Sequence, residues 1–444
     1  MAAAKLNASS TGRVRQRVVV IGGGFAGINA AMSLADLPVD VTLVDRKNYH
    51  TFQPLLYQVA LAVLSPADIA QPIRSILRDH PNIEVLMDEA VGFDLDQRHV
   101  SLKTGAVLTY DYVIVATGST HSYFGHDDWA KLAPGLKTVE DATEIRRRVL
   151  LAFELAERHM LERGTHPPLN FVIVGGGPTG VELAGAISDI ARLYMRNNFR
   201  YIDTKQAKVI ILEGSPHILG MYPDDLQRKA RKQLAALGVE LRTSAQVSDI
   251  QPGYVMVGDE RIDAIVTLWA AGVQASPLGK ILGFETDKRG CVLVDAHLNP
   301  KDHPEIFICG DLAHVEQNGK QLPGVAQPAM QMGTYAARRI GMLVGRAAGS
   351  EGRSQKDFHY FDKGDMATIG RKAAIARIEW PFKAHWSGFM AWLAWLMVHI
   401  FFLIGFRNRL SVFRQWAWTY LTLQDGARLI TGSQDLPGWK EENR

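Results

Sequence analysis

Two glycine-rich loops of the same design lie about 150 residues apart in this chain. Residues 22–27 read GGGFAG after the apolar run VVVI, and residues 175–180 read GGGPTG after FVIV. Each pattern predicts a buried strand, a tight turn and the start of a helix. In such a loop the first glycine permits the turn, the second lets the backbone approach a pyrophosphate, and the third allows close helix–strand packing. Two loops therefore predict two nucleotide-binding α/β domains.

The similarity extends beyond the loops. Each is followed by a second apolar strand that ends in small residues, at 112–118 and at 265–272. Gly118 lies 96 positions after Gly22, and Gly272 lies 97 positions after Gly175. Equal spacing indicates two copies of one domain plan. Small residues at these strand ends let the backbone pass close to a bound nucleotide, so Thr117, Gly118 and Gly272 are predicted binding positions.

Each copy also places an acidic residue at the end of its next strand. Asp45 follows Gly22 by 23 residues, and Glu213 follows Gly175 by 38, with a polar, predicted helical stretch at 189–206 between them. A carboxylate there accepts hydrogen bonds from ribose hydroxyls and repels a 2′-phosphate. The second copy is therefore predicted to prefer NADH over NADPH. The alternative is that each acid is a solvated charge at a strand end.

Composition narrows the class of protein. The chain has 444 residues, which favours about three domains, and its net charge of +3 does not indicate a nucleic-acid partner. The first dozen residues contain no apolar core of a secretory signal, so we expect the domains to be cytoplasmic. No metal site is predicted. The two cysteines, Cys291 and Cys309, form no CxxC dithiol of the kind that disulfide reductases need beside the flavin.

The order of these motifs, followed by Gly310-Asp311 after an apolar strand, resembles the two-dinucleotide-binding-domain flavoprotein superfamily. The resemblance implies that the first domain holds FAD, non-covalently, and that the second, inserted into it, holds NADH. It also implies that Asp311 binds the ribityl or pyrophosphate region of FAD. A helix N-cap at Asp311 is a compatible alternative.

Two further segments narrow the resemblance. YHTFQPLLYQVA at 49–60 and LPGVAQPAMQ at 322–331, which opens a predicted helix, resemble the type II NADH dehydrogenases over essentially the whole chain. This family implies a non-proton-pumping NADH:quinone oxidoreductase, in which hydride passes from NADH to N5 of FAD and two electrons then pass to a membrane quinone. It places Ala326 and Gln327 against the flavin, and Gln327 and Gln331 at the quinone site. The alternative for both glutamines is a solvated helix face.

Glu182 is the other candidate catalytic residue, together with Gln327 and Gln331. It is predicted in the first turn of the helix after the second loop, where an acid also complements the helix dipole. By resemblance it faces the nicotinamide and the flavin, where it positions the carboxamide or influences proton uptake. We favour positioning.

The last 65 residues differ from the rest of the chain in composition. They hold seven of the nine tryptophans, and residues 384–406 contain no Asp, Glu, Lys or Arg. Residues 389–406 are at the lower limit for a spanning helix. A helix over 410–423 is predicted to present Leu410, Phe413, Ala417, Tyr420 and Leu421 on one face. A membrane-surface helix pair is favoured over burial in a homodimer contact or a membrane span. His399 is expected to be a packed histidine.

These observations predict two Rossmann-like α/β domains plus a C-terminal helical membrane-association region, peripheral on the cytoplasmic face of the inner membrane. We expect an FAD domain at 14–124 and 292–350, an NADH domain at 125–291 and a membrane-association and dimerisation region at 351–444. The predicted FAD ligands are Gly22, Gly24, Gly27, Asp45, Thr117, Gly118, Asp311, Ala326 and Gln327. The predicted NADH ligands are Gly175, Gly177, Gly180, Glu182, Glu213 and Gly272. The alternatives are a sulfide:quinone oxidoreductase and a non-catalytic, membrane-docked nucleotide sensor.

Overall fold

The computed structural model describes residues 15–166, 168–347, 356–422, 427–433 and 435–439. The chain separates into two compact units, and each is made of three segments. Unit 1 comprises residues 1–50, 72–120 and 274–361, and unit 2 comprises 51–71, 121–273 and 362–444. The predicted domain limits at 14, at 350 and 351 and at 444 lie outside the described residues.

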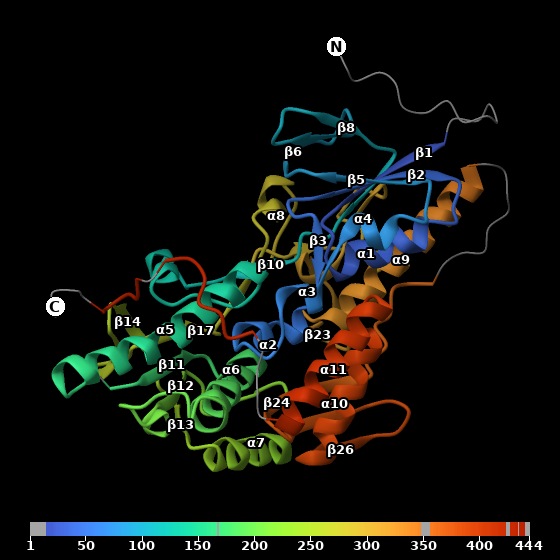
Figure 1. The fold of residues 1–444 in the computed structure, drawn as a ribbon. Helices are drawn as coiled ribbons and strands as arrows, with labels where there is room; N and C mark the ends of the chain where they lie inside the picture. Colours follow the sequence, from blue (N-terminus) through green and yellow to red (C-terminus); the bar gives the residue numbers. More distant parts are fainter. Residues whose placement is uncertain (1–14, 167, 348–355, 423–426, 434, 440–444) are drawn as a thin grey trace. The chain divides into compact units, whose positions relative to one another are not determined.

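Unit 1 is built on a five-stranded parallel sheet in the order β20-β9-β1-β2-β5. Its central strand β1 is buried from Val18 to Ile21, as expected for a parallel strand covered on both faces. Helices α1 and α9 lie side by side in this unit (Figure 1). The elements are β1 Gln16–Ile21, α1 Phe25–Leu34, β2 Val39–Asp45, β5 Ile83–Met87, β9 Tyr112–Val115, β20 Ile306–Ile308 and α9 Ala326–Ala347.

Smaller elements complete unit 1. An antiparallel sheet runs in the order β6-β7-β8. Two short pairs are β19-β21, whose strands lie on either side of residue 311 in sequence, and β22-β23, whose strands both follow it. The bounds are α4 Ile73–Leu77, β6 Ala90–Asp94, β7 His99–Leu102, β8 Val107–Thr109, α8 Leu278–Ile281, β19 Val292–Leu293, η5 Gly310–Leu312, β21 Ala313–His314, β22 Glu316–Gln317 and β23 Lys320–Gln321.

Unit 2 repeats the plan with a four-stranded parallel sheet, in the order β13-β12-β11-β17. Its longest helix, α5, starts with a capping box in which the Thr138 hydroxyl accepts from the Asp141 amide, and the Asp141 carboxylate accepts from the Thr138 amide. The main elements are α5 Val139–Arg163, β11 Asn170–Val174, α6 Pro178–Asp189, β12 Lys208–Glu213, α7 Asp224–Ala236, β13 Val239–Thr243 and β17 Val266–Trp269.

The remaining elements are short. They are β3 Tyr49–Thr51, η1 Gln53–Leu55, α2 Leu56–Ala60, α3 Pro66–Ile69, β4 Ala70–Pro72, β10 Ser119–His121, η2 Asp127–Lys131, η3 Ile190–Tyr194, η4 Thr204–Gln206, β14 Val247–Gln251, β15 Tyr254–Val257, β16 Glu260–Asp263 and β18 Val273–Ala275. The predicted helical stretch at 189–206 is therefore wrong in part. Only a π-helical turn and a 3-10 turn form there, because α6 ends at Asp189.

The C-terminal part of unit 2 joins a sheet to a helix pair. Strands β24 Gly364–Gly370, β25 Ala373–Ile378 and β26 Ala384–Ser387 form an antiparallel sheet, and helices α10 Phe389–Phe402 and α11 Phe406–Thr422 follow it. Strand β24 lies so close to α6 that a Cβ on Gly185 would be 1.8 Å from the Ile369 carbonyl oxygen. None of the helices in the described ranges is both long enough and apolar enough to cross a bilayer.

Helix α11 begins four residues before the predicted start at Leu410, and Leu423 lies outside the described residues. The side of α11 that packs inward carries Val412, Trp416 and Thr419. Leu410, Phe413 and Leu421 are exposed instead, with Leu421 at 84%. Most of the predicted apolar face is therefore exposed, while Tyr420 packs on the Trp392 ring at a centroid distance of 4.7 Å.

Candidate functional site

The first glycine loop has the geometry expected of a phosphate cradle. Gly22 has φ 101°, and a Cβ there would lie 2.4 Å from the Ala116 carbonyl oxygen. A Cβ on Gly27 would lie 1.7 Å from the Gly22 carbonyl oxygen, so helix α1 approaches the strand end as closely as glycine allows. Gly24, at the start of α1, faces open space, since nothing lies within 4 Å of a Cβ built on it.

The second loop reproduces the first contact by contact. Gly175 has φ 109°, and a Cβ on Gly180 would lie 2.0 Å from the Gly175 carbonyl oxygen. Gly177 faces open space, like Gly24. At the neighbouring strand ends Gly118 and Gly272 both adopt positive φ, 68° and 76°. The equal sequence spacing thus corresponds to equal backbone geometry.

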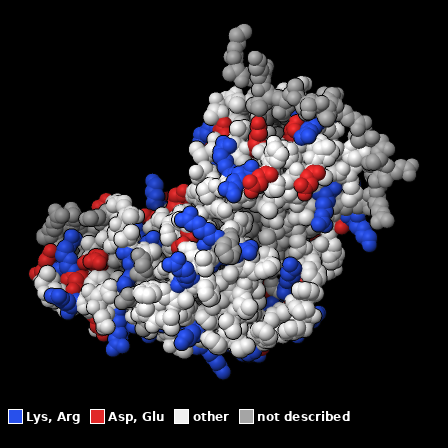
Figure 2. Space-filling view, turned by 45° about the vertical axis from the view of Figure 1, so that its right-hand side comes forward, with Lys and Arg blue, Asp and Glu red and all other residues white. Residues whose placement is uncertain are grey.

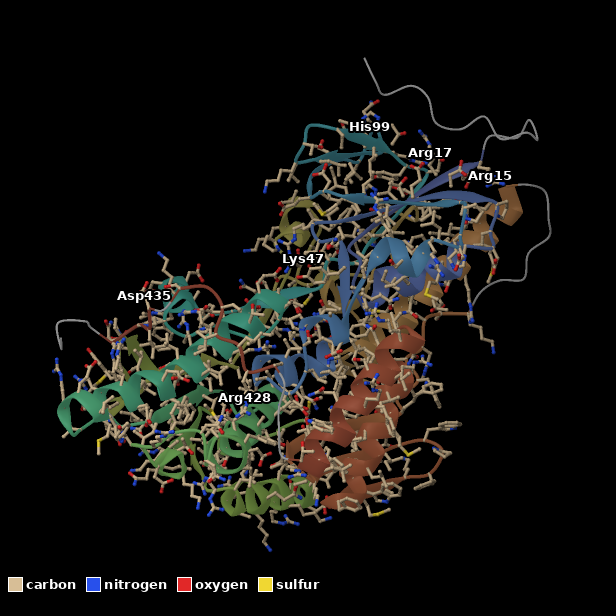
Figure 3. The ribbon with its side chains drawn as sticks, in the orientation of Figure 1. Arg15, Arg17, Lys47, His99, Arg428 and Asp435 are labelled. Atoms are coloured by element: carbon tan, nitrogen blue, oxygen red, sulfur yellow. The ribbon has the colours of Figure 1, made fainter. Side chains whose placement is uncertain are left out.

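The two acids are held in the same way. Asp45 accepts hydrogen bonds from the Gly23 amide at 2.6 Å and from the Lys47 amide at 2.7 Å; Lys47 is labelled in Figure 3. Glu213 accepts from the Gly176 amide at 2.6 Å and from the Ser215 amide at 2.7 Å. Each carboxylate therefore lies beside the middle of its glycine loop, where the ribose next to a bound pyrophosphate is expected.

Unsatisfied polar atoms near the first loop fit a bound nucleotide. The Thr117 hydroxyl and His50 Nε2 are buried and find no partner among the described residues. His50 Nδ1 is 2.9 Å from the Gly23 carbonyl oxygen, so Nδ1 carries the proton and Nε2 is an acceptor. Burial lowers the pKa of His50, which keeps the ring neutral. Buried polar atoms without partners are uncommon, and the hydroxyl-rich FAD would satisfy them.

Asp311 lies in the short 3-10 turn η5. Its carboxylate accepts from the Ser119 hydroxyl at 2.6 Å, and Gly324 packs against it. Cys309, not Asp311, occupies the cap position of this turn, so the alternative of an Asp311 N-cap is wrong. A Cβ on Gly310 would lie 3.5 Å from Ala329 of α9 and 3.6 Å from Ala26 of α1. The turn, the start of α9 and the first glycine loop therefore gather in unit 1.

Helix α9 begins at Ala326, as predicted, so Gln327 lies in its first turn and is half-buried. Gln331, one turn later, is hydrogen-bonded at both ends of its amide. Its Oε1 accepts from the Phe361 amide at 2.9 Å, and its Nε2 donates to the Phe361 carbonyl at 3.0 Å. Gln331 therefore fixes the backbone at residue 361, and this engagement was not predicted.

Glu182 is the fifth residue of α6 and so lies just beyond the first turn, which corrects the predicted position. It accepts a long hydrogen bond, 3.4 Å, from the Thr368 amide of β24. Burial raises the pKa of Glu182 to about 8, and the Thr368 amide opposes this rise. The side chain is therefore largely protonated at neutral pH and can donate a hydrogen bond, for example to a carboxamide oxygen.

This pKa makes a prediction for stability. Between pH 4.5 and about 8 the folded protein keeps a proton on Glu182 that the unfolded chain releases, so this group makes the protein less stable as pH rises through that range. We expect Glu182→Gln to remove this contribution. Its thermal midpoint relative to wild type should rise from acidic to mildly alkaline pH and level off above about 8. A difference independent of pH would contradict the assignment; Glu162→Gln, on exposed α5 surface, is the control.

Neither cysteine has the low thiol pKa expected of a reactive cysteine. Burial raises the pKa of the Cys309 thiol far above its ordinary value and that of Cys291 to about 11. Cys291 Sγ donates to the Asp311 carbonyl at 3.4 Å. Because the thiolate is the nucleophile, both residues are weak candidates for the reactive cysteines of a sulfide oxidoreductase.

The C-terminal helix pair has one buried and one apolar exposed side. Trp395 stacks on His399 at 4.0 Å, and His399 Nδ1 donates to the Trp395 carbonyl at 2.7 Å. Burial lowers the pKa of His399 to about 4, so it is a neutral, packed histidine, as expected. Figure 2 shows a broad surface with few acidic residues in the region where Figure 1 places the two helices. Large apolar side chains exposed there are Phe389, Met390, Met397, Phe401, Leu410, Phe413, Trp418 and Leu421.

Comparison with known proteins decides the family. Residues 16–333 match the family described as pyridine nucleotide-disulphide oxidoreductase, and residues 363–425 match the NDH2 C-terminal domain. Type II NADH:quinone oxidoreductase NdhA of Mycobacterium tuberculosis is 41% identical over 430 residues, which cover 94% of this chain and 90% of the relative. The chain belongs to the type II NADH:quinone oxidoreductases. The predicted enzyme class, FAD cofactor and NADH substrate are thereby confirmed.

Solved structures support the fold of this type II oxidoreductase. NDH2 from Plasmodium falciparum in complex with NADH has a TM-score of 0.80 at 18% identity, and the match covers 94% of this chain and all of that one. The sulfide:quinone oxidoreductase of Aquifex aeolicus has a TM-score of 0.68 at 18% identity, covering 96% of this chain and all of that one. The predicted class of two nucleotide-binding α/β domains is confirmed.

Sequence reasoning overlooked three residues of the site in this oxidoreductase. His50 lies within a segment quoted for the family resemblance, five residues after Asp45, but nothing in the pattern indicated that it bonds to the glycine loop. Tyr57 and Thr368 are hydrogen-bonded to each other although 311 positions separate them. No local pattern could have paired them.

Proposed function

We propose that unit 1 holds FAD and unit 2 holds NADH, and that the protein passes two electrons from NADH to a membrane quinone without pumping protons. The observation that carries this division is the duplicated loop, in which each copy has its own open glycine and its own carboxylate. In this proposal residues 14–124 and 292–350 form the FAD domain, 125–291 the NADH domain and 351–444 the membrane-association region. These limits differ from those of the units, since residues 51–71 belong to unit 2 and residues 274–291 to unit 1.

When bound, FAD supplies a ring that accepts a hydride and returns electrons to a quinone. The chain's own groups bind and orient it. Gly22, Gly24 and Gly27 cradle the pyrophosphate, while Asp45 and Asp311 accept hydroxyl hydrogen bonds. The Thr117 hydroxyl, Gly118 and the start of α9, at Ala326 and Gln327, line the rest, and the α9 dipole favours negative charge at its N-terminus.

In unit 2 the cradle of Gly175, Gly177 and Gly180 receives the NADH pyrophosphate. A Cβ on Gly272 would lie 2.6 Å from the Phe124 ring, so Gly272 would contact the nucleotide through its backbone. Glu213 accepts from the adenosine ribose. Protonated Glu182 donates to the carboxamide oxygen and so orients the nicotinamide.

The proposed quinone site involves two glutamines of α9. Gln327 takes part at this site, and Gln331 acts there by holding the backbone of residue 361.

Anaerobic mixing tests this function. NADH is expected to bleach the flavin of the full-length holoenzyme, and a quinone added second is expected to restore its absorbance. Failure of NADH to bleach would overturn the dehydrogenase assignment. Bleaching without reoxidation by quinone would favour a nucleotide sensor, and bleaching by sulfide would favour a sulfide oxidoreductase.

We also propose that α10 and α11 lie on the cytoplasmic face of the inner membrane. Their exposed side is apolar, while Arg407 and Arg414 are exposed beside it and suit anionic lipid headgroups. Tryptophans are enriched in this region, as they are at membrane interfaces. A homodimer that covers part of the same apolar side is compatible with this arrangement.

Two single substitutions test the membrane surface. Met397 is 68% exposed and Leu421 is 84% exposed, so Met397→Glu and Leu421→Glu should leave unit 2 folded. Each is expected to weaken binding to phosphatidylglycerol-containing vesicles by about 10- to 100-fold, since a buried apolar side chain contributes about 1.5–3 kcal/mol. Co-sedimentation measures this.

The matched control is Leu161→Glu on α5, which is also exposed, at 59%, but lies far along the chain from the helix pair. It should sediment with vesicles like wild type. Both variants remaining bound to vesicles while the oligomer dissociates would assign the apolar side to a dimer contact. These substitutions test the surface better than deleting residues 380–444, because Trp395 and Trp416 belong to the core of unit 2.

A further inference from the structure

A buried chain of hydrogen bonds within unit 2 connects helix α11 to the neighbourhood of Glu182. At its centre is Tyr57 of α2, which is 7% exposed. The Tyr57 hydroxyl oxygen accepts from the Thr368 hydroxyl at 2.9 Å and from Gln58 Nε2 at 3.0 Å. Two partners on one hydroxyl hold the ring and its neighbours in a single arrangement.

The chain continues to the C-terminal helix pair. The Trp416 indole N–H donates to Gln58 Oε1 at 2.7 Å, and both side chains are buried. The Gln58 amide therefore uses one end for α11 and the other for Tyr57. The Trp395 ring packs on Tyr57 at a centroid distance of 6.3 Å and on Trp416 at 5.8 Å. Both hydrogen bonds and ring packing therefore connect the helix pair to α2.

On its other side the chain reaches the nucleotide helix. Thr368 is held at two points, since its hydroxyl bonds to Tyr57 and its amide donates to Glu182. The position of Thr368 therefore determines whether Glu182 keeps this donor. The titratable groups that interact electrostatically with Glu182 are Tyr57 on α2 and Tyr222 before α7, and Tyr222 also interacts with Asp365 and Arg377 of the C-terminal sheet. Asp189 lies two turns further along α6.

We propose that Tyr57 is a positioning residue for NADH oxidation. It holds Thr368 against Glu182 and is itself held by Trp416, so the C-terminal helix pair supports the geometry of the nicotinamide side. This inference rests on the proposed role of Glu182 toward the carboxamide. It assigns to the helix pair a second task besides membrane contact.

The test is the pH profile of flavin reduction by NADH, measured anaerobically on the full-length holoenzyme by stopped flow. In the wild-type protein the rate of flavin reduction should fall as pH rises through the pKa of Glu182. In Glu182→Gln this pH-dependent step in the rate should be absent. Tyr57→Phe should keep the step but move it to higher pH by roughly 0.5 to 1 unit, because Glu182 loses the donor that favours its ionised form. Trp416→Phe should move it in the same direction.

Matched variants separate positioning from a loss of stability. Tyr110 is also a buried tyrosine, but its hydroxyl finds no partner among the described residues, so Tyr110→Phe should leave the profile unchanged. If Tyr57→Phe does not fold, Thr368→Val takes its place, since it removes the hydroxyl and keeps the amide. Thr368→Ser, which keeps both, should behave like wild type.

The outcomes distinguish the two proposals. A wild-type step that Glu182→Gln does not abolish would overturn the role of Glu182. A step that depends on Glu182 but stays in place in Tyr57→Phe and Thr368→Val would overturn the role of Tyr57 alone. A shift in Tyr57→Phe without one in Trp416→Phe would overturn the link to the helix pair.

Discussion

Gly24→Ala is expected to fold normally and to be purified largely without FAD. Gly24 has φ −73°, which any residue adopts, and a Cβ there meets no atom of the protein within 4 Å. The space that the methyl group would fill is the space into which the second glycine of such a loop admits a pyrophosphate. Overpacking by a methyl group costs about 1–3 kcal/mol, so FAD affinity should fall by about 10- to 100-fold. Flavin content and titration of the apoprotein measure the loss.

The duplicated loop supplies the controls. Gly177→Ala makes the same change in unit 2, where the Cβ is equally unobstructed, and should raise the KM for NADH while FAD stays bound. Gly27→Ala should instead impair folding, because its Cβ would lie 1.7 Å from the Gly22 carbonyl oxygen. Full flavin content in Gly24→Ala would contradict the cradle assignment. Loss of FAD in Gly177→Ala would contradict the assignment of one nucleotide to each unit.

Much of this site could be predicted from the sequence because the residues of each glycine loop lie close together along the chain. A strand, three glycines and a helix start occupy fewer than twenty consecutive residues, and the acid follows at the end of the next parallel strand. The register of β1 with β2 and of β11 with β12 then brings each acid beside its loop. Spacing alone could therefore predict Asp45 and Glu213 as neighbours of the glycines.

The network around Tyr57 could not be predicted in this way. Its members come from α2, β24 and α11, and tertiary packing, not sequence spacing, brings them together. Which side of α11 is buried could not be predicted for a related reason. Both sides of this helix carry aromatic residues, so the apolar pattern could not say which side packs inward. The packing of Trp416 on Gln58 and Trp395 makes that choice.

Glu213→Gln is expected to let NADPH compete with NADH. The Glu213 carboxylate accepts from the Gly176 and Ser215 amides, at 2.6 and 2.7 Å, and from the Ser215 hydroxyl at 2.6 Å. Glutamine keeps one acceptor oxygen and the shape of the side chain but removes the charge that repels a 2′-phosphate. Juxtaposed like charges cost up to several kcal/mol, and relief of about 1.4–2.8 kcal/mol of this repulsion would lower the ratio of kcat/KM for NADH over NADPH by about 10- to 100-fold. Steady-state kinetics with both nucleotides measures it.

Glu213→Arg is a harsher change, because it removes the acceptor of both amides as well as the charge, and it should weaken NADH itself. Asp45→Asn is the internal control: it neutralises the matching acid of the first loop, which accepts from Gly23 and Lys47. It should lower flavin affinity and leave the choice between NADH and NADPH unchanged. Unchanged selectivity in Glu213→Gln would mean that Glu213 stabilises the glycine loop through its hydrogen bonds and does not contact the ribose. Altered selectivity in Asp45→Asn would mean that the first loop, not the second, contacts the nicotinamide nucleotide.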